Sequence, residues 1–226
     1  MSALFIGRAV AGNLEISPTS VEVGAPGLAS TVTLKNRGDK PVKLQTRLLS
    51  WSQTPAGEKL VKTNDVVVSP PFVEIQQNGT AVIRIVRLSK SQVKTEETYR
   101  FLVDEIPSRI ANKKTTIQMV MRYSLPVFFT DGQHENPTFD MDAQQLNGKL
   151  VLNVQNQGAE HLKLFDMRAE GPDGRSVSFG NGLVGYVLAG ASNTFAARGK
   201  QFPKGSSVII SSNTNLGKIT RTVKLR

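Results

Sequence analysis

The sequence contains no cysteine, which removes several kinds of chemistry at once. A disulfide framework, a thiolate nucleophile and a thiolate metal site are all excluded. Histidine is scarce as well, since His134 and His161 are the only two. No Gly-x-Ser-x-Gly motif accompanies either of them, so a serine hydrolase is disfavoured, and two isolated histidines make a weak case for a metal site. We therefore expect no enzyme, no metal and no cofactor.

Long apolar runs are also missing from the sequence. None approaches the ~18 residues that a membrane-spanning helix requires, so we expect a soluble chain without stable membrane insertion. Residues 1–12 are apolar and end in small residues, which is consistent with the remnant of a signal peptide, although Arg8 is unusual in such a segment. We leave these residues out of the fold prediction.

Acidic residues are fewer than basic ones, with 18 Asp and Glu against 28 Lys and Arg, and the formal net charge is +10. This excess is typical of proteins with an anionic partner, although it is equally consistent with a solvated basic face. Nucleic acid is a poor candidate, because Arg84, Arg87, Arg100 and Arg122 are spread over three expected strands. One tryptophan and three tyrosines also leave little for base stacking. We predict no nucleic-acid partner.

What the sequence does contain is a series of short segments rich in Val, Ile, Thr and Phe, separated by Gly, Pro, Asn and Asp clusters. No apolar stripe of helical period persists for three turns, so the pattern predicts an all-β protein. The turn-rich segment 130–137 divides it into two sandwich domains, 13–129 and 138–226. No internal repeat is visible. The expected strands are 30–34, 42–51, 59–62, 72–75, 80–88, 98–105 and 116–129, followed by 149–154, 162–169, 184–188, 194–197, 207–211 and 219–225.

A glycine-rich run at 180–185 fits the dinucleotide-binding pattern GxGxxG. That pattern requires a strand before it, a helix after it and an acidic residue about 20 positions further on. This context is missing here. We therefore interpret the run as a hairpin or a β-bulge.

The most informative segment is the expected strand 116–129, where six apolar side chains alternate on one face. Most such rows pack inside their own sandwich. Unbranched methionines, however, are typical of surfaces that accept varied partners, and Pro126, which cannot donate a ladder hydrogen bond, favours an edge strand. A long apolar edge is kept mainly where it is meant to pair with another chain. The row consists of Ile117, Met119, Met121, Tyr123, Leu125 and Val127.

This segment belongs to a wider resemblance to a known family. The chain is similar to the periplasmic chaperones of the chaperone–usher pilus pathway, and among them to the archaic, Csu-type branch. The resemblance covers nearly all of residues 13–226. It is carried most clearly by residues 68–71, 83–85, 98–107, 118–128 and 185–188.

The resemblance implies two immunoglobulin-like β-sandwich domains in a boomerang arrangement and a non-enzymatic protein of the periplasm. Such a chaperone binds, folds and stabilises pilus subunits by donor-strand complementation, in which an alternating apolar row fills the groove of an incomplete subunit sheet. It then delivers the subunits to an outer-membrane usher, and it is a monomer or a weak dimer when free. By matching position, Ile117, Met119 and Met121 are the donor residues, with Tyr123 as an additional contact.

The chain departs from the better-known branch of the family at the anchor for the subunit's C-terminal carboxylate. That branch uses an arginine on the first strand and a lysine late on the last strand of domain one, where Ser20 and Pro126 stand here. A buried carboxylate still requires cationic partners. We therefore hypothesise that Arg122 and Arg84, with Arg100 as a third candidate, form the anchor.

Two alternatives stay open at this point. Arg84 and Arg100 could instead form internal ion pairs with Asp104 or Glu105. The whole protein could also be a β-sandwich adhesin or a structural component of a secretion or pilus assembly, using the same sheet edges for permanent contacts.

Overall fold

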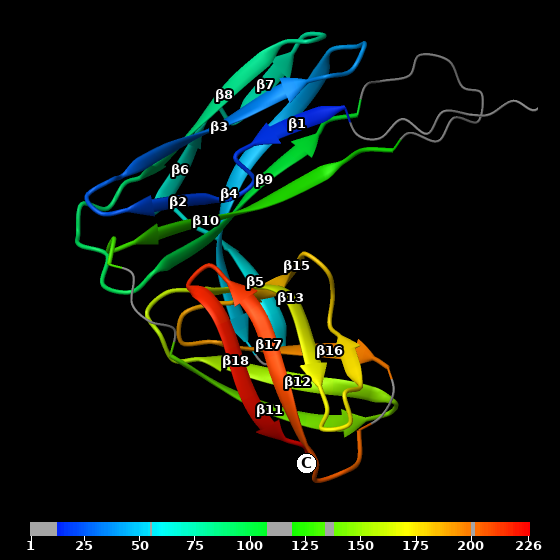
Figure 1. The fold of residues 1–226 in the computed structure, drawn as a ribbon. Helices are drawn as coiled ribbons and strands as arrows, with labels where there is room; N and C mark the ends of the chain where they lie inside the picture. The colour runs from blue at the N-terminus through cyan, green and yellow to red at the C-terminus, as the bar shows by residue number, and fades with distance from the viewer. Residues whose placement is uncertain (1–12, 55, 108–118, 134–137, 200–201) are drawn as a thin grey trace, which may run out of the picture.

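The computed structural model describes residues 13–226 except residue 55 and residues 108–118, 134–137 and 200–201 (Figure 1). The described residues form strands and no helix, in two β-sandwich domains set at an angle to each other (Figure 1). Strands β1 to β10 build the first domain and β11 to β18 the second. The predicted all-β fold with two immunoglobulin-like domains is confirmed.

The first domain packs two sheets face to face. One has the strand order β1-β3-β8-β6, and the other has the order β2-β10-β9-β4-β5, with β7 paired to β4. Alternate residues of each strand point into the core, as Ile83 and Ile85 do from β8 and Phe101 and Val103 from β9. The strands are β1 (Leu14–Ser17), β2 (Val21–Gly24), β3 (Ala29–Asn36), β4 (Val42–Thr54), β5 (Gly57–Lys62), β6 (Val66–Ser69), β7 (Phe72–Ile75), β8 (Thr80–Arg87), β9 (Glu97–Glu105) and β10 (Arg122–Thr130).

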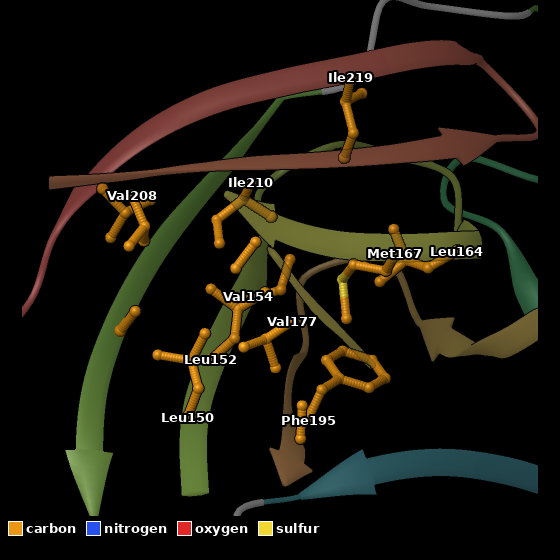
Figure 2. Close-up of a cluster of buried hydrophobic side chains, with 14 of the residues drawn as sticks. Leu150, Leu152, Val154, Leu164, Met167, Val177, Phe195, Val208, Ile210 and Ile219 are labelled. Atoms are coloured by element: carbon orange, nitrogen blue, oxygen red, sulfur yellow. The ribbon is translucent and has the colours of Figure 1, made fainter. Parts of the chain in front are cut away.

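The second domain repeats this construction with shorter sheets. Strands β11-β12-β16 form one sheet and β14-β13-β17-β18 the other, with β15 paired to β13. Figure 2 shows the core, where Leu152 and Val154 of β12 face Met167 of β13 and Ile210 of β17. The strands are β11 (Phe139–Leu146), β12 (Lys149–Asn156), β13 (Leu162–Glu170), β14 (Ser176–Ser178), β15 (Leu183–Val187), β16 (Ser192–Arg198), β17 (Ser207–Thr214) and β18 (Gly217–Lys224).

The glycine-rich run covers the turn after β14 and the first residues of β15, and it pairs with β13 at a bulge. Asp166 at this bulge has a positive φ of 48°, and its carboxylate accepts a hydrogen bond of 2.7 Å from the backbone N–H of Gly182. Gly182 itself has φ 68°, a conformation that costs glycine little. The run is therefore a turn against a bulge, as expected from the sequence, and no helix follows it.

The two domains contain equivalent turns, so the expectation that the chain has no internal repeat was wrong. Residues 34–44 and 154–164 each carry a buried asparagine at the end of a strand, Asn36 and Asn156. Each asparagine accepts a hydrogen bond of 2.9 Å from the backbone N–H two residues on and donates one of 2.7 Å to the carbonyl four residues on. The two segments also share sequence, since a glycine follows each asparagine two residues later and both segments end in Lys-Leu.

A small apolar cluster joins the domains. It contains Trp51 of β4 and Phe128 of β10 from the first domain, and Tyr186 and Leu188 from the second. Gln53, near the end of β4, adds two hydrogen bonds of 2.9 Å: it donates to the carbonyl of Tyr186 and accepts from the N–H of Leu188. Strand β10 therefore takes part both in the core of the first domain and in the junction with the second.

Candidate functional site

The apolar row on β10 divides into a buried part and an exposed part. Leu125 and Val127 are 6% and 0% exposed and belong to the core of the first domain. Tyr123 is partly buried against that core. Met121 and Met119, before the strand begins, are 40% and 81% exposed. The side chains of this row are therefore buried in the domain's own core after Tyr123 and exposed to solvent before it.

Ile117 lies outside the described residues. Met119 and Met121 were expected within a strand, but β10 begins only at Arg122. One backbone contact continues the ladder beyond it, because the N–H of Glu105 donates a hydrogen bond of 3.0 Å to the carbonyl of Met121. The segment around Met121 is therefore aligned with the strand.

Strand β10 has a free edge over half of its length in the described part of the chain. On one side β9 pairs with it from Arg122 to Phe129, while on the other side β2 pairs only with residues Val127–Thr130. Because hydrogen-bonding directions alternate along an antiparallel ladder, the backbone groups of Arg122 and Ser124 point to the open side. The predicted edge is found before Val127 and is wrong after it, where β2 covers the strand.

A pocket of about 320 Å³ lies beside the two methionines. Met119 and Met121 form one wall, and Leu14 and Val42 at the end of the first sandwich contribute apolar surface. The nearby hydroxyl of Tyr123 is buried and has no hydrogen-bond partner among the described residues, and this burial raises the pKa of Tyr123. The exposed methionines therefore lie next to apolar residues at the end of the first domain's core.

Arg122 points to the opposite face of the sheet and is not free. Its Nε donates to Oδ1 of Asp104, while Nη2 of Arg47 lies 2.5 Å from Oδ2 of the same carboxylate. Burial raises the pKa of Asp104, but the hydrogen bonds from the two arginines outweigh burial and the pKa is lowered overall. The internal ion pair that we expected for other arginines is thus made by Arg122 and by Arg47, and no pattern in the sequence singles out Arg47.

Arg100 lies where the two domains meet. Its guanidinium carbon lies 3.6 Å above the ring of Trp51 and 5.7 Å from that of Tyr186, and its side chain is 14% exposed. Its ion partner is Glu58 at 3.2 Å, instead of Asp104 or Glu105. Lys163 of the second domain approaches the same tyrosine ring to 5.9 Å. Two cations from different domains therefore surround Tyr186, and the second was missed because the sequence does not show how domains meet.

Arg84 lies elsewhere. Strand β8 belongs to the other sheet of the first domain, so the expectation that it neighbours β10 was wrong. Its exposed side chain alternates with the buried Ile83 and Ile85 and points away from the core. The structure brings Arg122 and Arg100 to one face of one sheet and leaves Arg84 on the outside of the opposite sheet.

The two positions that carry the anchor in the better-known branch do meet in this fold. Val21 at the start of β2 pairs with Val127, so Ser20 lies beside Pro126. Across the ladder on the other side, Pro126 pairs directly with Arg100. The guanidinium group of Arg100, on the neighbouring strand β9, is thus a cation next to the position of Pro126.

Other kinds of site were sought among the described residues. No three His, Asp or Glu side chains there are arranged to hold a metal ion. The described residues also include no helix long and apolar enough to cross a membrane.

Residues 13–131 match the family described as pili and flagellar-assembly chaperones, PapD N-terminal domain. The match spans more than half of the chain and includes all of β10. The chain belongs to this family. The expected resemblance is thereby confirmed, and this pilus chaperone, like its family, is not an enzyme. The family match gives no support to the alternative of an adhesin. Among curated proteins, none matches the chain.

Solved structures of pilus chaperones share the fold over nearly the whole chain. The chaperone CsuC of Acinetobacter baumannii, in a pre-assembly complex with the tip subunit CsuE of archaic Csu pili, has a TM-score of 0.70 at 20% identity, covering 94% of this chain and 99% of that chain. The Pseudomonas aeruginosa chaperone CupB2 has a TM-score of 0.61 at 19% identity, covering 94% and 100%. The Salmonella enterica chaperone SafB, bound to the pilin SafA, has a TM-score of 0.63 at 14% identity, covering 96% and 97%.

Proposed function

We propose that this chaperone binds unassembled pilus subunits by adding the segment from Ile117 to Tyr123 to an incomplete subunit sheet. The observation that carries the proposal is the division of the β10 row. Its apolar side chains leave their own core at Tyr123, and Met121 and Met119 are exposed beside a strand edge that is free from Arg122 to Pro126. An apolar row joined to an open edge is suited to strand addition.

The backbone groups and the side chains of this edge contribute differently to binding. Backbone N–H and C=O groups form the same hydrogen bonds with any partner strand, so they supply affinity that tolerates different subunit sequences. The methionine side chains contribute burial, and fully burying such a side chain stabilises a contact by about 1.5–3 kcal/mol. Their flexible, unbranched shape allows them to fit grooves that differ in detail.

We further propose that the protein acts in the periplasm and passes its subunits to an outer-membrane usher of an archaic-type pilus system. Support comes from the family and from the likeness of fold to CsuC, which was solved with a tip subunit of archaic chaperone–usher pili. SafB was likewise solved with its pilin.

The donor proposal is tested by replacing Met119 and Met121 together with Glu and co-expressing the variant with a pilus subunit from the same organism. Both side chains are already exposed, so we expect an unchanged melting temperature and at least a tenfold loss of co-purified subunit. The matched control replaces Val82 and Ile209, which are 54% and 47% exposed on other surfaces, with Glu. Undiminished binding by the methionine variant would show that the subunit docks elsewhere.

For the carboxylate anchor we propose Arg100 as the principal residue, ahead of Arg122. Arg100 lies directly across the ladder from Pro126, where the better-known branch has its lysine, and its guanidinium lies against Trp51 and near Tyr186, where the two domains meet. In its pair with Glu58, Nη2 of Arg100 lies 3.2 Å from Oε1 of the carboxylate, and half of the Glu58 side chain is exposed. An incoming carboxylate can therefore compete with Glu58 for Arg100. Arg122 is already bound to Asp104.

This anchor is tested with semisynthetic subunits that end in a free carboxylate or in an amide. Arg100→Ala should weaken binding of the carboxylate form by about tenfold or more and that of the amide form much less, because a charge-assisted hydrogen bond contributes about 1.5–3 kcal/mol. Arg122→Ala serves as the control and should affect both forms alike. Equal losses for both forms with Arg100→Ala would remove Arg100 from the anchor.

A further inference from the structure

A second feature of the junction between the domains is a buried contact between two titratable side chains. Glu96, just before β9, belongs to the first domain, and His161, just before β13, belongs to the second. Their side chains are 0% and 3% exposed, and Nδ1 of His161 lies 2.7 Å from Oε2 of Glu96. This side-chain contact joins the two domains.

The contact is closely built on both sides. The backbone N–H of His161 donates to Oε1 of Glu96 at 3.1 Å, so each carboxylate oxygen has a partner. The N–H of Glu96 also donates to the carbonyl of Ala159, at 3.3 Å. The imidazole stacks on Phe128 of β10, with 3.7 Å between ring centroids and 8° between ring planes. Rotation of one domain against the other would break all of these contacts together.

The surroundings of the pair are negative. Glu96 and His161 line a pocket of about 700 Å³ together with Glu22 of β2 and Glu160, the residue before His161. Tyr186 of β15 approaches the imidazole to 5.8 Å between centroids, and the cations of Arg100 and Lys163 lie 5.7 and 5.9 Å from the same tyrosine ring. Nε2 of His161 is buried and has no hydrogen-bond partner among the described residues. Of the ion pairs found in the described part of the chain, the one that includes Glu96 is made with His161.

The free energy of burying the Glu96–His161 pair depends on how many protons the two side chains hold. When one proton is added to a neutral imidazole and a carboxylate, it can sit on either side chain. The pair is then either an imidazolium with a carboxylate or a neutral imidazole with a carboxylic acid, and its net charge is zero in both cases. Without that proton, the pair carries a buried negative charge near the Glu160 carboxylate, which is unfavourable in a medium of low dielectric constant. Burial raises the pKa of Glu96 and outweighs the lowering by His161. A group with a raised pKa favours the closed junction at low pH and loses this contribution as the pH rises through that pKa.

We propose that Glu96 and His161 form a proton-dependent latch that holds the two domains at a fixed angle and loosens as the pH rises. The latch acts on the proposed binding edge through Phe128, because His161 stacks on a residue of β10, the strand that carries Tyr123 and directly follows Met121. An effect on subunit affinity rests on the proposed function. The effect on the angle between the domains does not, and it is measured on the free protein.

The test uses the absence of cysteine from the chain. Thr31→Cys and Thr222→Cys place one spin label on an exposed position of each domain, and pulsed electron resonance then gives the distance distribution between the labels. From about pH 4 to about pH 8, the range over which carboxylates and imidazoles titrate, we expect a narrow distribution that broadens as the pH rises. Glu96→Gln imitates the neutral acid and should keep the distribution narrow throughout.

Two further variants separate the latch from general effects of pH. His161→Asn keeps a donor for Glu96 but removes the charge of the imidazole, which lowers the pKa of Glu96, so the broadening should move to higher pH. His134→Asn removes the only other histidine and should leave the wild-type response unchanged. The proposal is overturned if the wild-type distribution does not change with pH, or if Glu96→Gln broadens as the wild type does.

Discussion

At the scale of single residues, Arg87 shows how a charge that looks available in the sequence is used inside the fold. Its side chain is 2% exposed, and its guanidinium donates to both carboxylate oxygens of Glu97 at 2.7 and 2.8 Å. It also donates to the carbonyls of Ser89 and Ser91. These bonds fix the segment between β8 and β9, so Arg87 stabilises the first domain and is not a ligand for a phosphate.

We therefore predict that Glu97→Ala destabilises the first domain by about 3–5 kcal/mol, because it leaves a buried guanidinium without its counter-charge. The control is Glu15→Ala, which removes an exposed partner of Arg37 and should lower the free energy of unfolding far less. Urea unfolding measures both values. Similar losses for the two variants would mean that the buried pair contributes no more than a surface pair.

The residues of the anchor hypothesis show which part of a site the sequence can predict. Alternation of apolar and polar residues correctly places the Arg84 side chain on the outside of its strand, but it says nothing about which sheet the strand joins. Arg47 was missed because its role depends on sharing Asp104 with Arg122, a contact between three strands. Lys163 was missed for a similar reason, since it reaches the cleft only when the domains meet.

At the scale of elements, β10 was predicted in most respects because period-two alternation is a strong local signal. The sequence could not show that the row changes its role at Tyr123, since the same alternation suits a core and a binding edge. Pro126 indicated the free edge, but the four-residue β2 that ends this edge at Val127 was not expected. Short strands such as β1, β2 and β14 hold too few residues for a periodic pattern, and β11 is largely polar.

At the scale of the whole molecule, the two domains are joined by contacts that cannot be predicted from either domain alone. Trp51, Phe128, Tyr186 and Leu188 form an apolar cluster, Gln53 bonds to the backbone of the second domain, and Glu96 bonds to His161. Arg100 lies above this cluster in the cleft. The junction, the candidate anchor and the donor strand thus meet along β10 and β9, which gives the cleft a defined shape before any subunit arrives.

The central claim is that a subunit strand pairs with the free edge of β10, and hydrogen–deuterium exchange of the chaperone with and without its subunit tests this most directly. The backbone N–H groups of Arg122 and Ser124 face the open edge in the free protein, so they should exchange fast alone and at least tenfold more slowly in the complex. Amides of the exposed outer strand β6 serve as the internal reference and should not change. Slower exchange elsewhere in the chaperone, with Met119 to Ser124 unaffected, would contradict donor-strand binding at this site.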